Sequence, residues 1–475
     1  MTAGVLRTIV LTPRRVAAAV ALSLLAWSGS YARAEILAGA SVRVITPSPL
    51  LPVSGGMGPA KPAREKRGEL TARALVLRKG ETTVGIVSLD LLGFPSVLGD
   101  RVRAKVPRIA PDGILIGSTH THSAPDCYAF PDGKGGHSGD LAYMNLVCDR
   151  AAEALNEALD RLEPARIQIA TGEAEGKIAY NYYAPDLYDR RMSVIRASKP
   201  SGGTIATLAN YAIHPEVLGN EAGILAPDLV GPLCEEIEAK VGGVALFMNG
   251  AQGGMVTADN RRLDQPNDPI RGYWKDERSW EECLRIGRLM ASEALRIVAD
   301  APAQDDPRLA CTSRMVRFPV ESDLMWAVVV GSPLNYPRNP DRSVSARINL
   351  VELGDARILT IPRRSSAEHR LLPQAKDGRE AQPAVRPDQR RLRLHPDPRR
   401  LPELPEIRVH LPDIARRGYG RDPHRKRSEA AGRGGKTLTA GGIRLNAPSR
   451  VPAQHRRASV RRGRRRPSSR RSAEG

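Results

Sequence analysis

The hydrophobic pattern of this 475-residue chain ends abruptly after residue 362, which limits how much of the chain can build a folded domain. Residues 363–475 contain one aromatic residue, Tyr419, and long runs of Arg and Pro without a helical or strand period. Such a segment buries too little apolar surface to offset the entropy of ordering it. We therefore expect a folded domain over 35–362 and a disordered basic C-terminal tail over 363–475.

The charge distribution has the same boundary. Residues 1–362 carry 41 Lys and Arg against 41 Asp and Glu, whereas residues 363–475 carry 31 against 11, so the net charge of +20 lies in the tail. A basic segment binds phosphate groups without sequence specificity. We therefore expect the tail to be able to bind anions nonspecifically. We expect no specific nucleic-acid partner, because residues 1–362 have no excess of positive charge.

The N-terminus has the three parts of a secretory signal peptide. Arg7, Arg14 and Arg15 precede the apolar run Val16–Trp27, and a small-residue pattern, Ala-Arg-Ala, ends at Ala34. The run is short for a membrane span and is followed at once by the cleavage pattern. We predict a signal peptide over 1–34, cleaved near Ala34, and export to the periplasm or the medium. An uncleaved membrane anchor is the alternative.

The five cysteines lie far apart and form no CxxC motif. An oxidising compartment permits disulfides, but an odd number of widely spaced cysteines requires none. Whether Cys127 and Cys148 pair is left open, and so is the oligomeric state.

Between about residues 38 and 362, strand and helix patterns alternate, which predicts an α/β fold with a mixed β-sheet core flanked by helices. Predicted strands are Ser41–Ile45, Thr71–Leu77, Thr83–Leu89, Ile114–Ile116, Ile205–Tyr211 and Gly243–Phe247. Predicted helices cover about Ser96–Lys105, 141–162 and a segment around Ile286–Ile297, each with apolar residues three and four positions apart.

Histidines follow two of the predicted strands, at the ends where α/β proteins gather functional residues. His120 and His122 follow the strand at 114–116, and His214 follows the strand at 205–211. In an extended segment, side chains two positions apart point to the same side. Imidazoles that converge from separate strands suit Zn²⁺, which keeps one position for water in catalytic sites. Alternatively, each histidine only hydrogen-bonds the backbone of its own turn.

Three motifs resemble those of the neutral/alkaline ceramidases, in the order in which that family has them, and cover most of 38–362. They are Gly117-Ser-Thr-His-Thr-His-Ser-Ala-Pro125, Asn210-Tyr-Ala-Ile-His-Pro215 and the glycine-rich Phe247-Met-Asn-Gly-Ala-Gln-Gly253. Asp228, in Ala226-Pro-Asp-Leu-Val-Gly231, fits the acidic turn between the last two.

The resemblance implies zinc-dependent hydrolysis of an N-acyl amide, ceramide or a related lipid-like substrate, to a fatty acid and an amine in sphingolipid metabolism. It implies that His120 and His214 ligate Zn²⁺ and that His122 binds the substrate carbonyl or the developing oxyanion. By the same resemblance, Gly253 and Thr257 are catalytic candidates, and the substrate-binding candidates are Asn181, Asp228, Asn249 and Gly250.

The chain departs from the family at several points. Its loop reads Gly253-Gly-Met-Val-Thr-Ala-Asp-Asn260 where the family has Gly-Asp-x-Ser-Pro-Asn, so Thr257 only loosely replaces the serine. The family's Asn-Arg pair is here Asn181-Tyr182. We interpret these differences as those of a divergent branch whose acyl substrate need not be ceramide. The family also completes its zinc site with a later Glu and Tyr, so we expect impaired catalysis in this chain.

A shifted reading frame just after the Pro362 codon is a second explanation of the tail. With one base removed, the codons of Pro405–Asp413 can encode Pro-Lys-Tyr-Glu-Tyr-Ile-Ser-Arg-Thr, which resembles the family's continuation. An intact frame with stop codons in the hidden phase would reject this hypothesis.

Two alternatives to an active enzyme also stay open. One is a non-catalytic secreted protein whose tail binds an anionic polymer or membrane, and the other is an inactive descendant of the enzyme.

Overall fold

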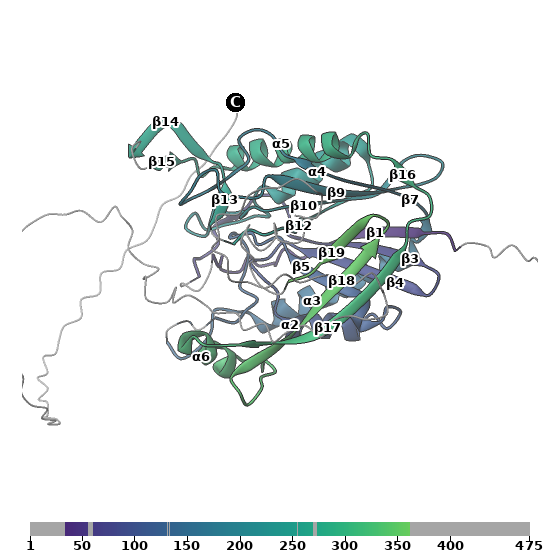
Figure 1. Cartoon of the computed structure of the whole chain (residues 1–475). Coiled ribbons are helices and arrows are strands. Elements are labelled where there is room, and N and C mark those ends of the chain that lie inside the picture. Colours follow the sequence, from purple (N-terminus) through teal and green to yellow (C-terminus); the bar gives the residue numbers. More distant parts are fainter. Residues whose placement is uncertain are drawn as a thin grey trace, which may run out of the picture. The chain divides into compact units, whose positions relative to one another are not determined.

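Two five-stranded sheets face each other in the computed structural model, which describes residues 34–361 except 56–59, 131, 133, 254 and 269–272 (Figure 1). The first sheet has the order β5 (Ile114–Ser118), β4 (Thr82–Leu89), β3 (Thr71–Lys79), β1 (Leu37–Val44), β6 (Glu163–Pro164). The second has the order β12 (Val244–Asn249), β10 (Thr204–Tyr211), β9 (Arg191–Ser198), β7 (Arg166–Glu173), β16 (Ala303–Gln304). In each sheet one edge pair, β4–β5 or β10–β12, is parallel, and the other pairs are antiparallel.

The two sheets and the helices on their outer faces form four layers, with apolar side chains packed between neighbouring layers. Leu77 of β3 and Leu208 of β10 belong to the cluster between the sheets. Helices α2 (Ser96–Ala104) and α3 (Leu141–Asp160) pack on the first sheet, and α4 (Val230–Val241) and α5 (Trp280–Val298) pack on the second (Figure 1). Because both of their faces are covered, β3 and β4 are buried along most of their length, and each has a run without polar side chains, Ala74–Leu77 in β3 and Val84–Val87 in β4.

The two long helices α3 and α5 begin at side-chain caps. Asp140 accepts a hydrogen bond from the Tyr143 N–H at the start of α3, and Ser279 accepts one from the Glu282 N–H at the start of α5. These bonds satisfy N–H groups that have no partner within the helix. The apolar stripes at three- and four-residue spacing on α3 and α5 are the faces that pack on the sheets.

A third sheet and several short pairs complete the described part of the chain. The third sheet has the order β17 (Leu309–Pro319), β18 (Ser343–Leu353), β19 (Ala356–Leu359), with α6 (Asp323–Gly331) between β17 and β18 in sequence. The short pairs are β2 (Glu65–Lys66) with β11 (Ile224–Leu225), β8 (Ala179–Asn181) with β13 (Val256–Ala258), and β14 (Arg261–Asp268) with β15 (Tyr273–Asp276). A short 3-10 helix, η1 (Pro111–Gly113), precedes β5.

The predicted fold class, a mixed β-sheet core flanked by helices, is confirmed. The boundaries differ where pairing extends a strand: β1 begins at Leu37 rather than Ser41, because its first residues pair with both β3 and β6. The predicted tail lies outside the described residues, as does the signal peptide except for Ala34. The division into a signal peptide, a domain and a tail therefore stays a prediction.

All five cysteines fall in the described part of the chain, and all are free thiols. Cys127 and Cys148, whose pairing the sequence left open, are both buried and unpaired. Among the described residues, no helix has the length and apolar composition needed to cross a membrane.

Candidate metal centre

Three histidine rings meet at strand ends that belong to the two facing sheets. His120 and His122 follow β5 of the first sheet, and His214 follows β10 of the second. The ring centroids are 4.9 Å apart for His120 and His122, 5.1 Å for His120 and His214, and 5.9 Å for His122 and His214. One ligand nitrogen of each ring lies within 4.8 Å of the others, so the group could hold a metal ion. The predicted convergence is confirmed, while the role of each ring stays a prediction.

The Nδ1 atoms of two rings bind main-chain carbonyl oxygens. His120 Nδ1 lies 2.5 Å from the oxygen of Leu92, and His214 Nδ1 lies 2.6 Å from the oxygen of Val256. A carbonyl oxygen can only accept, so Nδ1 carries the proton and donates in both rings. The Nε2 atom of each ring is therefore the one that presents a lone pair, as a metal ligand must.

The ring of His122 faces the ring of His120 through its own Nε2 atom. His122 Nε2 lies 3.3 Å from His120 Nε2, and His122 Nδ1 lies 3.5 Å from Glu216 Oε2. Two bare lone pairs this close would repel, so either one of the two nitrogens carries a proton and donates to the other, or both face a metal ion. Three imidazoles are a ligand set of catalytic zinc sites, so the residues present fit a zinc ion.

The backbone at the first two histidines is not extended, so the prediction of an extended segment there is wrong. His120 has a φ of 70°. The chain turns directly after β5, because the N–H groups of Thr119 and His120 donate to the carbonyl oxygens of Leu89 and Leu91 at 2.8 and 3.0 Å. This turn, rather than strand alternation, brings the two rings together. A positive φ at a non-glycine residue costs roughly 1–3 kcal/mol and persists only where the surrounding contacts hold it.

Main-chain hydrogen bonds hold His214 against the other motifs. Its N–H donates to the oxygen of Val256 at 3.0 Å, and the residue forms a parallel bridge with Thr257 of β13. The N–H of His122 donates to the oxygen of Pro215, also at 3.0 Å. The second motif is thus bound both to the first motif and to β13, which follows the third motif in sequence.

The start of the glycine-rich loop lies beside the first two motifs. Asn249 Nδ2 donates to the oxygen of Thr119, the neighbour of His120, and the N–H of Gly250 donates to the oxygen of Tyr211 at 2.8 Å. Asn249 and Gly250 are partly buried, as is Gly253 further along the loop. The structure thus brings Asn249 and Gly250 to the histidines, and the roles of all three residues stay predictions.

Glu216 is a site residue that the sequence reasoning missed. Its carboxylate lies against His122, and the hydroxyl of Thr257 hydrogen-bonds to it. Burial alone would raise its pKa, but His122, His214 and the Thr257 hydrogen bond hold the pKa below its ordinary value. The available signal was its position two residues after His214, in a turn that follows a strand.

Asp228 supports the turn that carries Glu216. Its carboxylate accepts hydrogen bonds from the N–H groups of Val217, Leu218 and Leu229 at 3.3, 2.9 and 2.8 Å, and it is fully buried. Burial raises the pKa of Asp228 to about 6, against the opposing effect of these bonds. The carboxylate of Asp228 therefore binds the main-chain N–H groups of neighbouring turns, and its predicted role in substrate binding stays a prediction.

Asn181, the other substrate-binding candidate, builds the loop that follows it. Its Oδ1 accepts from the N–H groups of Tyr183 and Ala184 at 2.9 and 3.2 Å, and its Nδ2 donates to the oxygen of Leu187 at 3.0 Å. Asn181 pairs with Val256 across β8 and β13, one strand away from His214. The structure therefore places Asn181 near the centre, with its amide bound to its own loop.

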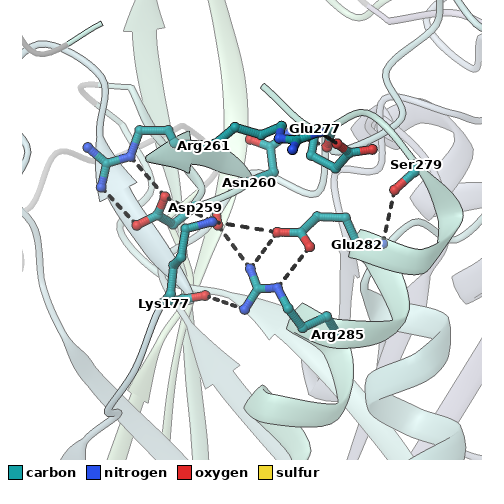
Figure 2. A network of polar contacts seen from close by, with 9 residues as sticks. Lys177, Asp259, Asn260, Arg261, Glu277, Ser279, Glu282 and Arg285 are labelled. Atoms are coloured by element: carbon teal, nitrogen blue, oxygen red, sulfur yellow. Dashed lines mark hydrogen bonds and ion pairs between the residues drawn. The ribbon is translucent and has the colours of Figure 1, made fainter. Parts of the chain in front are cut away.

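A network of charged side chains fixes the far end of β13 to α5 (Figure 2). Arg261 forms two hydrogen bonds of 2.8 Å to the carboxylate of Asp259. Arg285 of α5 donates to the main-chain oxygens of Asp259 and Lys177 at 3.0 Å and also contacts the carboxylate of Glu282. Because Thr257 lies two residues before Asp259, this network also restrains the strand that bridges to His214.

Solved structures with a similar fold include ceramidases. A neutral ceramidase from Pseudomonas aeruginosa matches with a TM-score of 0.53 and 16% identity, over 69% of this chain and 62% of the other. A ceramidase complexed with C2 matches with a TM-score of 0.53 and 17% identity, over 69% and 63%. This chain thus spans less than two thirds of either structure. No family model and no curated protein matches the sequence. The likeness establishes a ceramidase-like fold.

Proposed function

We propose that this chain is a zinc-dependent hydrolase that cleaves a linear N-acyl amide with a lipid-like acyl chain, releasing a fatty acid and an amine. The observation that carries the proposal is the convergence of His120, His122 and His214, with one ligand nitrogen of each within 4.8 Å of the others. The ceramidase-like fold and the three sequence motifs support an acyl amide as the substrate.

Each residue of the centre would have a distinct role. His120 and His214 would hold the ion through Nε2, because their Nδ1 atoms are bound to carbonyl oxygens. When bound, zinc lowers the pKa of a water molecule and polarises the substrate carbonyl. Asn249 and Gly250 would orient the amide, and Gly253 and Thr257 would act in catalysis. Asn181 and Asp228 keep the surrounding loops in place.

Release of fatty acid from a short-chain fluorescent ceramide, measured with the full-length chain, tests the proposal. We expect slow release that a chelator abolishes and Zn²⁺ restores, and that is lost in His214→Ala. His137→Ala is the matched control, because it removes the fourth histidine before residue 363, which is outside the centre. Release that survives both the chelator and His214→Ala would contradict the proposal.

A second candidate function rests on the charge of the tail. The excess of 31 Lys and Arg over 11 Asp and Glu after residue 362 favours nonspecific binding to an anionic polymer or membrane. Binding to heparin or anionic vesicles should then weaken with salt and disappear when residues 363–475 are removed. Salt-independent binding, or binding that persists without the tail, would contradict it.

Export is part of the same proposal. We expect the mature chain to begin near Glu35, after removal of the signal peptide. N-terminal sequencing of the protein recovered from the periplasm or the medium measures this directly, and a mature chain that begins at Met1 would contradict it.

A further inference from the structure

The three histidines of the centre differ in what binds their Nδ1 atoms. For His120 and His214 the partner is a main-chain carbonyl oxygen, which no side-chain substitution can remove. For His122 a side-chain carboxylate faces this atom, with Glu216 Oε2 3.5 Å away. One of the three ring orientations therefore depends on a side chain.

Glu216 is itself held from two directions. The N–H groups of Val217 and Leu218, which follow it directly, donate to the buried carboxylate of Asp228. On the other side, the hydroxyl of Thr257 hydrogen-bonds to the Glu216 carboxylate. The carboxylate thus cannot move freely away from the ring of His122.

A carboxylate at Nδ1 determines which nitrogen of the ring is protonated. A carboxylate oxygen accepts hydrogen bonds, so a proton on Nδ1 would face Glu216 and would leave the lone pair on Nε2. That lone pair points toward His120 Nε2, 3.3 Å away, in the middle of the group that could hold a metal ion. Histidine ligands of metals usually have such a partner at the other ring nitrogen, which orients the ring and raises its basicity.

We infer that Glu216 is a positioning residue that makes His122 the third metal ligand, with Thr257 holding Glu216 in place. The centre of this chain is then a three-histidine site completed from within residues 120–216, without a ligand from the C-terminal tail. The inference rests on the proposed function in one respect, namely that the centre binds a divalent metal. It also changes the role of His122, from a contact of the substrate carbonyl to a ligand.

Cobalt binding to the full-length chain tests this inference, because Co²⁺ replaces Zn²⁺ and its visible absorption reports the coordination. The variants are Glu216→Gln, which keeps the size of the side chain, Thr257→Val and His122→Ala. Glu221→Gln is the matched control, since Glu221 lies on the same loop, is 76% exposed in its side chain, and pairs only with Lys61 in the described part of the chain.

We expect Glu216→Gln to weaken Co²⁺ binding roughly 10- to 100-fold, the usual effect of losing such a partner. Thr257→Val should weaken it less, and His122→Ala should also change the absorption bands because a ligand is lost. Glu221→Gln should bind like the wild type. Melting temperatures measured without metal show whether each variant is folded. If Glu216→Gln does not fold, weaker binding by a folded Thr257→Val supports the inference, and unchanged binding overturns it.

The outcomes separate the inference from the proposed function. If the wild type binds no Co²⁺, the proposed metal centre fails and the inference fails with it. If the wild type binds one Co²⁺ but folded Glu216→Gln and His122→Ala bind it with the same affinity and spectrum, the inference alone is overturned. Weaker binding by Glu216→Gln with a normal Glu221→Gln control supports both.

Discussion

Two polar clusters adjoin the strand β13, and they differ in their balance of charge. In the cluster of Figure 2, Arg261 and Arg285 are matched by the carboxylates of Asp259 and Glu282, and the hydrogen bonds run between groups of opposite charge. In the metal centre, three imidazoles surround one point with a single carboxylate, Glu216, beside them. The first cluster is complete within the protein and holds elements together. The second gathers lone pairs, which is the composition of a cation site.

The largest effect should come from Asp228, which supports the centre from outside. Asp228→Ala leaves three buried N–H groups without their acceptor and places alanine at a φ of 53°. We expect the free energy of unfolding to fall by about 3–5 kcal/mol. Urea denaturation followed by circular dichroism measures this, and a loss below about 1 kcal/mol would show that the turn is held by other contacts.

The stability of the protein should depend on pH through the carboxyl group of Asp228. Because the folded-state pKa of Asp228 is about 6, above its usual value in an unfolded chain, its protonated form favours folding. This contribution is complete below the unfolded pKa and is lost as the pH rises through about 6. Relative to Asp228→Asn, the wild type should lose up to about 3 kcal/mol between pH 4 and 7. Parallel pH profiles of the two proteins would contradict the prediction.

Zinc should stabilise the metal centre and leave the charged cluster unaffected. A ligand at 100 times its dissociation constant stabilises the native state by about 2.7 kcal/mol. We expect thermal unfolding of the wild type to shift upward accordingly with Zn²⁺ and that of His214→Ala to stay unchanged. An equal shift in both proteins would place the binding elsewhere.

Breaking the charged cluster should lower the stability of the protein and leave its zinc binding unchanged. Arg285→Ala removes two hydrogen bonds to main-chain oxygens and the contact with Glu282, and we expect a loss of about 1–3 kcal/mol in stability. The stoichiometry of Zn²⁺ should stay the same as in the wild type. Loss of stoichiometric zinc in a folded Arg285→Ala would show that the two clusters are not separate.

The sequence predicted the parts of the site that depend on local pattern. His120, His122 and His214 follow apolar strands, and α/β proteins gather functional residues at strand ends, so their convergence could be predicted. That β5 and β10 belong to two different sheets could not. The glycine-rich loop, which begins at Asn249 and Gly250, follows a third strand for the same reason, and Asn249 does contact the first motif.

Other features depend on tertiary contacts that no local pattern contains. Glu216 reaches His122 because Asp228 and Thr257 hold its turn, and these residues are distant in sequence from the first motif. The positive φ of His120 depends on the carbonyl groups at the end of β4. The strands β17 and β18 were not predicted, since they are only partly buried and carry many polar residues.

Metal content tests the central claim most directly. The full-length chain is incubated with Zn²⁺, dialysed against metal-free buffer at neutral pH, and analysed for zinc beside His214→Ala and His137→Ala. We predict one zinc per chain in the wild type and in His137→Ala, and none in His214→Ala. No zinc in the folded wild type, or equal zinc in His214→Ala, would contradict a metal centre built from His120, His122 and His214.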